Sequence, residues 1–222
     1  MALQTVRFPS FDRVGDFEAE LRQIVKVADS GRTVPSEWRE FLITGDYTPT
    51  RGVQNLFLEL SEEKQQPPEA KIVKPLTVIL NAAWNYALSH PRRGKTVQNL
   101  SFDLLQRPMG PRPVERLGWH CGDPPRFLVA LGLTTVGAVG ETPLPEGYKL
   151  PDHPVGQIGL AGKVLQSIVD QNEGRLPDGV KESRPDIGEL VFVDQDCVHR
   201  PPDNETGEVV DRLFGKITPH YS

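Results

Sequence analysis

A short apolar segment late in the chain, residues 190–193, predicts a buried strand. A polar turn follows this segment and leads to His199. A second predicted strand, residues 209–217, carries Arg212 thirteen positions after that histidine. We expect the two strands to be neighbours, with His199 and Arg212 side by side. A histidine placed in this way can bind a metal ion, and the arginine beside it can bind a carboxylate group.

The proline and glycine content favours a β-rich fold. The chain has 222 residues, a length that suits one domain, and 21 of them are proline and 20 are glycine. Such a composition predicts many loops and turns, which a helical bundle would not tolerate. The formal net charge of −5 and the lack of a long basic run exclude nucleic acid as the main partner.

The chain carries no sign of a membrane or secretory context. No segment approaches the roughly 20 apolar residues of a membrane span, and the first residues lack an apolar signal core. Cys121 and Cys197 are its two cysteines, and they form no CxxC pair. We therefore expect a reduced, cytoplasmic protein. Each cysteine lies near a histidine of interest, so a disulfide between them is an open alternative.

The first part of the chain is predicted to be mainly helical after a short edge strand within residues 1–12. Asp16 is expected to cap a helix that ends near Gly31, and a second helix is expected over residues 36–45. Residues 53–60 suit a strand or a helix equally well, and residues 61–70 suit a solvated loop. Another helix is expected with Pro75 in its first turn and its end before Pro91.

From residue 96 onward the pattern changes to strands with long connections. Apolar residues alternate over 100–104 and again over 127–133, with a proline-rich link at 107–113 between the two segments. A further helix is expected over residues 160–169. Residues 140–157 and 174–186 are predicted to be loops, which are candidates for lids over a site.

This order of elements predicts an α+β, mainly β fold. Late strands rich in glycine and proline turns favour a double-stranded β-helix, or jelly roll, with N-terminal helices covering one face. We expect one domain over residues 1–222. Residues 1–95 form its helical cover, and residues 96–222 form the jelly-roll core with the site.

His120 and His199 are the strongest candidates for metal ligands. Each lies at a turn that borders a predicted strand, and 79 positions separate them. In a jelly roll, strands that are distant in sequence become neighbours, so the two rings can meet at one mouth. Two imidazoles and one carboxylate leave open positions suited to Fe(II) and oxygen chemistry. The alternative is that both are hydrogen-bonded turn residues.

The later part of the chain, about residues 96–218, resembles the Fe(II)/2-oxoglutarate-dependent oxygenase superfamily. In that family an arginine 10–15 positions after the second metal histidine holds the far carboxylate of 2-oxoglutarate, and Arg212 matches that position. The first family motif is His-x-Asp/Glu before a strand. Here it begins at His120, but the carboxylate position is occupied by Gly122.

This departure at Gly122 resembles the halogenase branch of the superfamily, where the missing carboxylate leaves room for chloride or bromide. Glycine has no side-chain oxygen to offer a metal. Two other arrangements remain open: a bulge that brings Asp123 onto the metal, or a water molecule beside the two histidines. The resemblance thus implies Fe(II), 2-oxoglutarate and O2 as cofactors, with chloride added in the halogenase alternative.

Further residues are weaker candidates. Gln98 and Ser101 lie on the strand before the motif and are predicted to contact the cosubstrate. Trp119, Arg126 and Arg200 are candidates for substrate contacts, although an aromatic residue under the rim and surface charges are the alternatives.

We therefore expect an oxidoreductase that hydroxylates an unactivated C–H bond of a small molecule, in a biosynthetic role. One alternative is a halogenase on the same fold. Another is a cupin-like binding protein or isomerase without iron, and a third is an iron-free regulatory relative. These alternatives differ in whether the histidines hold iron and whether a halide binds beside it.

Overall fold

The computed structural model describes residues 11–29, 40–60, 63–92, 94–111, 124–131, 137–139, 182–194, 197, 199–200, 204 and 206–222. The elements are β1 (Asp12–Asp16), α1 (Glu18–Asp29), β2 (Phe41–Thr48), β3 (Gly52–Leu60), β4 (Glu63–Gln65), α2 (Glu69–Ser89), β5 (Val97–Met109), β6 (Arg126–Leu131), β7 (Gly137–Val139), β8 (Glu182–Ser183), β9 (Glu189–Val193), β10 (His199–Arg200) and β11 (Val210–Tyr221). The fold is α+β and mainly β, as the sequence predicts.

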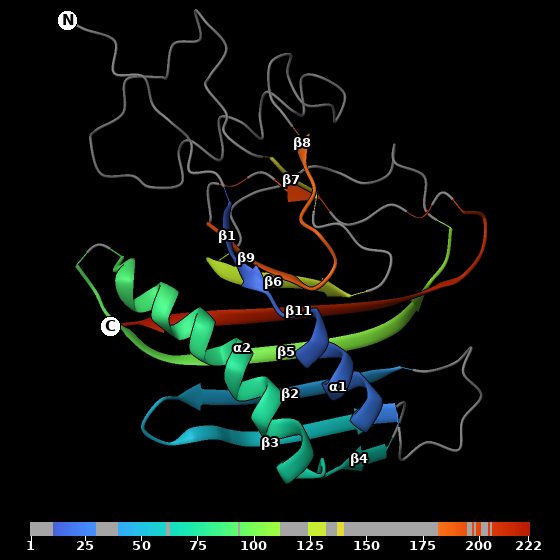
Figure 1. The fold of residues 1–222 in the computed structure, drawn as a ribbon, viewed down its shortest axis with the longest axis horizontal. Coiled ribbons are helices and arrows are strands. Elements are labelled where there is room, and N and C mark those ends of the chain that lie inside the picture. The colour runs from blue at the N-terminus through green and yellow to red at the C-terminus, as the bar shows by residue number, and fades with distance from the viewer. Residues whose placement is uncertain are drawn as a thin grey trace, which may run out of the picture.

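The strands form two antiparallel sheets. The larger has eight strands in the order β1-β9-β6-β11-β5-β2-β3-β4, and the smaller has the order β10-β7-β8 (Figure 1). The long strands β5 and β11 form the middle of the large sheet and pair from Val210↔Met109 to Tyr221↔Val97. This pairing joins segments about a hundred residues apart in sequence, so the middle of the sheet depends on long-range contacts, whereas β2, β3 and β4 pair as successive hairpins.

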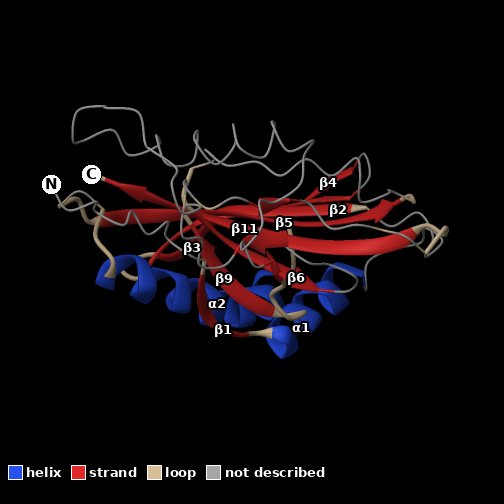
Figure 2. Ribbon diagram, turned by 90° about the horizontal axis from the view of Figure 1, so that it is seen from above, coloured by secondary structure: helices blue, strands red, loops and turns tan. Residues whose placement is uncertain are grey.

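Both helices lie on one face of the large sheet (Figure 2). We call this the helix-covered face. Alternate residues of the strands point into it and pack with α1 and α2 in one apolar core. Its most deeply buried large side chains include Phe41, Ile43, Leu100, Phe102, Phe127, Leu21, Ile24, Leu76, Ile79 and Leu80.

The helix boundaries confirm part of the predictions. Asp16 caps α1, because its Oδ1 accepts a hydrogen bond from the backbone N–H of Glu18 at 3.1 Å. Helix α2 ends before Pro91, as expected. The prediction that Pro75 lies in its first turn is wrong. The helix begins at Glu69, because an earlier turn buries Ile72 against the core.

Other expectations for the first half of the chain are wrong. In place of a helix over residues 36–45 the chain forms β2 from Phe41 onward, and the ambiguous residues 53–60 belong to β3. The predicted loop at 61–70 contains β4 and the start of α2. Strand β5 continues through Arg107 to Met109, where a link was expected. The predicted helix at 160–169 and the loop at 140–157 lie outside the described residues.

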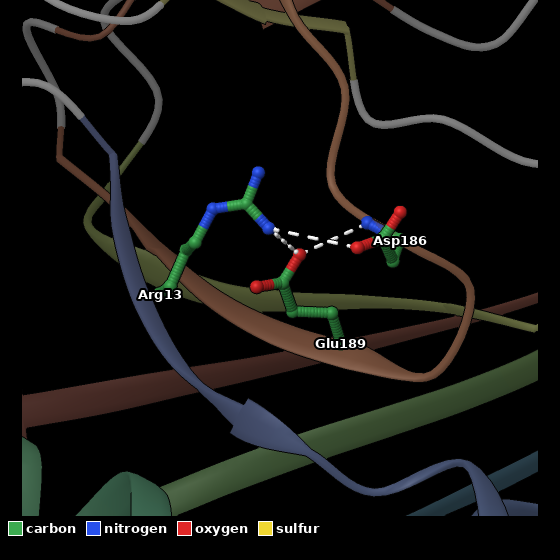
Figure 3. A network of polar contacts seen from close by, with 3 residues as sticks. All are labelled: Arg13, Asp186 and Glu189. Carbon is green, nitrogen blue, oxygen red and sulfur yellow. Dashed lines mark hydrogen bonds and ion pairs between the residues drawn. The ribbon is translucent and has the colours of Figure 1, made fainter.

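The edge of the sheet is held by polar contacts between β1 and β9 (Figure 3). Arg13 forms an ion pair with Glu189, and its guanidinium lies 3.9 Å from the carboxylate of Asp186. Glu189 also accepts a hydrogen bond from the backbone N–H of Asp186 at 2.9 Å. Gly188 precedes this strand with φ of +81°, and a Cβ there would lie 2.6 Å from the Cα of Glu18. This turn therefore needs glycine.

Neither helix among the described residues is both long enough and apolar enough to cross a membrane.

Candidate functional site

The side of the large sheet turned away from the helices carries Arg126 and Arg212, two of the candidate groups. We call it the opposite face. Because strand residues alternate, Arg126 and Leu128 of β6 share this face with Arg212, Phe214 and Lys216 of β11. A small apolar cluster lies on the same side, and Phe214 packs against it. Its buried members are Phe11, Leu128, Val191, Val193 and Cys197. Charged groups and a water-excluding patch thus lie next to each other.

His199 is buried, with 5% of its surface exposed, and both of its ring nitrogens have partners. Nδ1 lies 3.0 Å from the backbone carbonyl oxygen of Cys197. A carbonyl oxygen only accepts, so Nδ1 carries the proton and donates it. Nε2 therefore carries the ring's lone pair and acts as the acceptor. This is the tautomer and the anchoring that a histidine needs to bind a metal through Nε2.

Arg126 is the partner of this Nε2 atom. Its Nη2 donates to Nε2 of His199 at 3.1 Å, and its Nε atom is buried. Arg126 begins β6 in the large sheet, and His199 begins β10 in the small one. The bond therefore connects the two sheets. The sequence predicts Arg126 as a substrate contact, but no sequence pattern indicates its contact with His199.

The segment that carries His199 is fixed just before the histidine. The backbone N–H of Cys197 donates to the carbonyl oxygen of Asp194 at 3.0 Å. The Asp194 carboxylate in turn forms an ion pair with Arg92, which follows α2. Cys197 is buried, with 2% of its surface exposed. Cys121 lies outside the described residues, so the open alternative of a disulfide between them stays untested.

Arg212 is half-buried at the start of β11. Its guanidinium carbon lies 4.5 Å from the centre of the Phe214 ring, and its Nε atom is buried. Residues two apart in a strand share a face, so this stacking follows from the Arg-x-Phe spacing. A cation held over a ring beside an apolar cluster has its orientation fixed. Such a planar fork is suited to bind a carboxylate with two hydrogen bonds.

His199 and Arg212 do not lie on neighbouring strands, which corrects the expectation from the sequence. Strands β10 and β11 belong to different sheets. Because Phe127 pairs with Ile217, the backbone of Arg126 lies near the far end of β11, roughly 15–20 Å along the strand from the backbone of Arg212. The two groups thus approach the opposite face from its two ends, with Leu128 and Phe214 between them.

Other charges on this face pair among themselves. Asp103 accepts a hydrogen bond from Thr44 at 3.0 Å and lies 3.2 Å from the ammonium of Lys216. Arg107, which stands directly opposite Arg212 in the register, lies 3.3 Å from a carboxylate oxygen of Glu40. A pocket of about 250 Å³ opens beside that pair. It is lined by Glu40, Phe41, Leu42, Glu59 and Arg107.

The remaining candidates divide into two groups. Ser101 lies 2.9 Å from Nε2 of His220, and Gln98 donates to Thr96 at 3.3 Å, so a role in binding a cosubstrate stays a prediction for both. Arg200 follows His199 in β10. The other predicted site residues lie outside the described residues: Trp119, His120, Gly122 and Asp123. Among the residues that are described, no three His, Cys, Asp or Glu side chains are grouped so as to hold a metal ion.

No family model matches the chain, and no curated protein matches it in sequence. Several solved structures are similar to it, three of which are IDO, AviO1 and EvdMO1. IDO from Bacillus thuringiensis is 12% identical, covering 96% of this chain and 92% of its own, with a TM-score of 0.43. AviO1 from Streptomyces viridochromogenes Tue57 is 16% identical, with 96% and 89% covered and a TM-score of 0.42.

The third structure, EvdMO1, is 13% identical with a TM-score of 0.38 and covers 94% of this chain. The chain spans about half of the length of EvdMO1, 47%. Because all of these TM-scores are low, none of the similarities supports a function for this chain.

Proposed function

We propose that this chain is a non-haem Fe(II)/2-oxoglutarate-dependent oxidoreductase that hydroxylates an unactivated C–H bond of a small molecule. The observation that carries the proposal is the setting of His199. Its Nδ1–H is anchored on the backbone carbonyl of Cys197, and its Nε2 is directed to the opposite face, which also bears Arg212.

The histidine fits a metal ion. A buried imidazole whose other nitrogen donates to a carbonyl is oriented for coordination and made more basic. In the proposed site His120 supplies the second imidazole, and Asp123 or a water molecule supplies the third ligand. Bound iron would supply the activation of O2, with 2-oxoglutarate as the electron source. The chain's own part is to hold these ligands and to exclude water.

Arg212 fits the far carboxylate of 2-oxoglutarate. Its guanidinium is stacked on Phe214, and that ring packs against the apolar cluster. A carboxylate that pairs with this cation is partly removed from water, which strengthens the pair. The thirteen-position spacing from His199 also matches the 10–15 positions of the superfamily that the chain resembles. Arg212 would therefore orient the cosubstrate and fix its position in the site.

A double-stranded β-helix is the fold that goes with this proposal. Two antiparallel sheets support it. So does the pairing of β5 with β11, which are the first and the last described strands of the predicted core over residues 96–222. The bond between Arg126 and His199 brings the start of the small sheet against the large one. A site between two sheets would be shielded from water on both sides.

Halogenation is the second candidate, and Gly122 favours it. A glycine where the superfamily carries a carboxylate cannot coordinate a metal with its side chain. The vacant position would admit chloride. Adding chloride to the protein with iron and 2-oxoglutarate should then change its visible spectrum or its reactivity with oxygen. A protein indifferent to chloride would exclude halogenation and leave hydroxylation.

The decisive experiment for the proposed function is anaerobic addition of Fe(II) and 2-oxoglutarate. A weak visible charge-transfer band should appear in the wild-type protein. It should be lost in His199→Ala and should require much more 2-oxoglutarate in Arg212→Met. Arg107→Met removes a charge from the same face and should keep the wild-type band. Folded wild-type protein without any band would exclude the oxygenase and favour a cupin-like binding protein.

A further inference from the structure

Three contacts in a row connect Arg92 to the ring of His199. The guanidinium of Arg92 forms an ion pair with the carboxylate of Asp194, which directly follows β9. The backbone carbonyl of Asp194 accepts a hydrogen bond from the N–H of Cys197 at 3.0 Å. The carbonyl of Cys197 in turn accepts a hydrogen bond from Nδ1–H of His199 at 3.0 Å. The orientation of the imidazole ring therefore depends on how the end of β9 is held.

We propose that Arg92 and Asp194 are positioning residues for metal binding: their ion pair fixes the end of β9 and thereby sets the direction in which Nε2 of His199 meets the metal. This inference rests on the proposed function, in which His199 is a metal ligand. In this role neither residue contacts the metal. Both act through the carbonyl of Cys197, which anchors the histidine.

The backbone of Arg92 gives the ion pair a fixed base. Its N–H donates to the carbonyl of Lys95 at 3.2 Å, and its carbonyl accepts a hydrogen bond from the N–H of Lys95 at 2.8 Å. Gly94 lies within this tight turn with φ of +74°, a conformation that favours glycine. The next residue, Thr96, exchanges two backbone hydrogen bonds with Ser222, which follows β11. The turn that carries Arg92 is therefore joined to the middle of the large sheet.

The burial of the ion pair gives it a defined geometry. The side chains of Arg92 and Asp194 are 24% and 23% exposed. Arg13, which pairs with Glu189 at the other end of β9, is 49% exposed (Figure 3). Water and salt screen a mostly buried pair less than an exposed one, and the planar fork of an arginine orients a carboxylate. Without Arg92, the half-buried Asp194 carboxylate would lose this cation, and the end of β9 would shift toward water to hydrate it.

The test compares the two arginines that pair with carboxylates at the two ends of β9, by equilibrium binding of Co(II) without oxygen and without turnover. Arg92→Met should weaken Co(II) binding by about three- to tenfold and change the visible absorption of the bound ion, because a tilted imidazole alters the coordination. Arg92→Lys keeps the charge and should recover part of the affinity. Arg13→Met is the matched control and should bind Co(II) as wild type does.

A double variant tests whether the pair acts as a unit. Asp194→Asn should lose about as much Co(II) affinity as Arg92→Met does, and the double variant should lose no more than either single variant. The inference would be overturned by losses that add in the double variant. Equal Co(II) affinity and an identical absorption spectrum in Arg92→Met and Arg13→Met would overturn it as well.

A measurement on the metal-free protein separates this inference from the proposed function. In 15N-labelled protein, the Nδ1–H of His199, assigned from its absence in His199→Gln, should exchange with water roughly tenfold faster in Arg92→Met than in Arg13→Met. Arg92→Lys takes the place of Arg92→Met if the latter does not fold. Equal exchange rates would overturn the positioning role even if Co(II) binds. Wild type that binds no Co(II) would overturn the proposed function, and the exchange rates would then decide by themselves whether the ion pair positions His199.

Discussion

The two faces of the large sheet differ in what their side chains do. The helix-covered face is filled by apolar residues from α1, α2 and the strands, and many of them are fully buried. The opposite face combines a small apolar cluster with charged groups that each have a specific partner. His199, Arg126, Arg212 and Lys216 all have partners of this kind.

This difference separates the residues that stabilise the fold from the residues that would bind ligands. Burial of apolar surface is non-directional and large in sum, so the helix-covered face can carry most of the free energy of folding. Charged groups on a half-buried face contribute little to stability and are placed by geometry instead. Substitutions on the first face should therefore reduce stability, whereas substitutions on the second should reduce binding.

The largest effect is expected from Phe102→Ala on the helix-covered face. Phe102 is 1% exposed, and its ring lies against the position where Gly45 has no side chain. Removal of a buried ring leaves a cavity and should lower the free energy of unfolding by about 3–5 kcal/mol. Urea unfolding followed by circular dichroism measures this loss. A change below about 1 kcal/mol would contradict the assignment of stability to this face.

Arg212→Met should have a large effect on the binding of 2-oxoglutarate. The loss of a shielded partner for a carboxylate should weaken 2-oxoglutarate binding by about 2–4 kcal/mol, roughly 30- to 1000-fold. The free energy of unfolding should change by less than about 1 kcal/mol. Isothermal titration with 2-oxoglutarate and Co(II) gives the first quantity. Arg107→Met, at the paired position in β5, is the matched control, and equal affinity in both variants would remove Arg212 from the site.

A moderate effect is expected at Phe214, whose ring lies under the guanidinium of Arg212. Phe214→Leu keeps an apolar side chain but removes the π face, and should weaken 2-oxoglutarate binding by about 0.5–2 kcal/mol. Phe214→Tyr retains the ring and should stay close to wild type. If the leucine and tyrosine variants bind equally well, the ring does not orient the arginine.

A pH-dependent effect is expected from Tyr86 of α2, which packs on Phe127 and Phe192. Burial, and after it the hydrogen bond to Asp12, raises the pKa of Tyr86 far above its usual value near 10. The folded state thus holds a proton that the unfolded state releases. The contribution is complete below pH 10 and is lost as the pH rises above it. Tyr86→Phe should unfold with a flatter dependence on pH between 9 and 11, and an unchanged slope would contradict this.

The smallest effect is expected at the ion pair between Lys216 and Asp103. Their side chains are 39% and 36% exposed, so water and salt screen the 3.2 Å contact. Lys216→Met should change the free energy of unfolding by less than about 1 kcal/mol and leave 2-oxoglutarate binding unchanged. A marked loss of binding would show that the site extends further along β11 than proposed.

The sequence predicts the elements whose periodicity is local and regular. The apolar face of α2, the alternation in β5 and β6, and the buried segment of β9 all follow from spacing alone. The expected helix over residues 36–45 is wrong because the alternation of β2 is interrupted at Gly45. There the register with β3 shifts between Thr44 and Asp46, and pairing with β5 decides the structure. A long-range contact thus overrides the local pattern.

The same distinction between local spacing and long-range contacts applies to the site. The stacking of Arg212 on Phe214 follows from two-residue spacing in a strand and was predictable as shielding of that arginine. The bond between Arg126 and His199 joins residues 73 positions apart and depends on how β6 meets the small sheet. The anchoring of Nδ1 depends on a backbone carbonyl, and the identity of the residue that carries this carbonyl does not predict it. Spacing therefore identifies candidate residues but not their partners.

The central claim is that His199 binds a metal through Nε2 on the face that bears Arg212. An anomalous difference map from crystals grown with Co(II) and 2-oxoglutarate, collected at the cobalt edge, tests it most directly. We predict one strong peak about 2.0–2.2 Å from Nε2 of His199, with Arg126 turned away from that atom and a carboxylate on Arg212. A map with no peak at His199, or with Arg126 still bonded to Nε2 beside a metal bound elsewhere, would contradict the account.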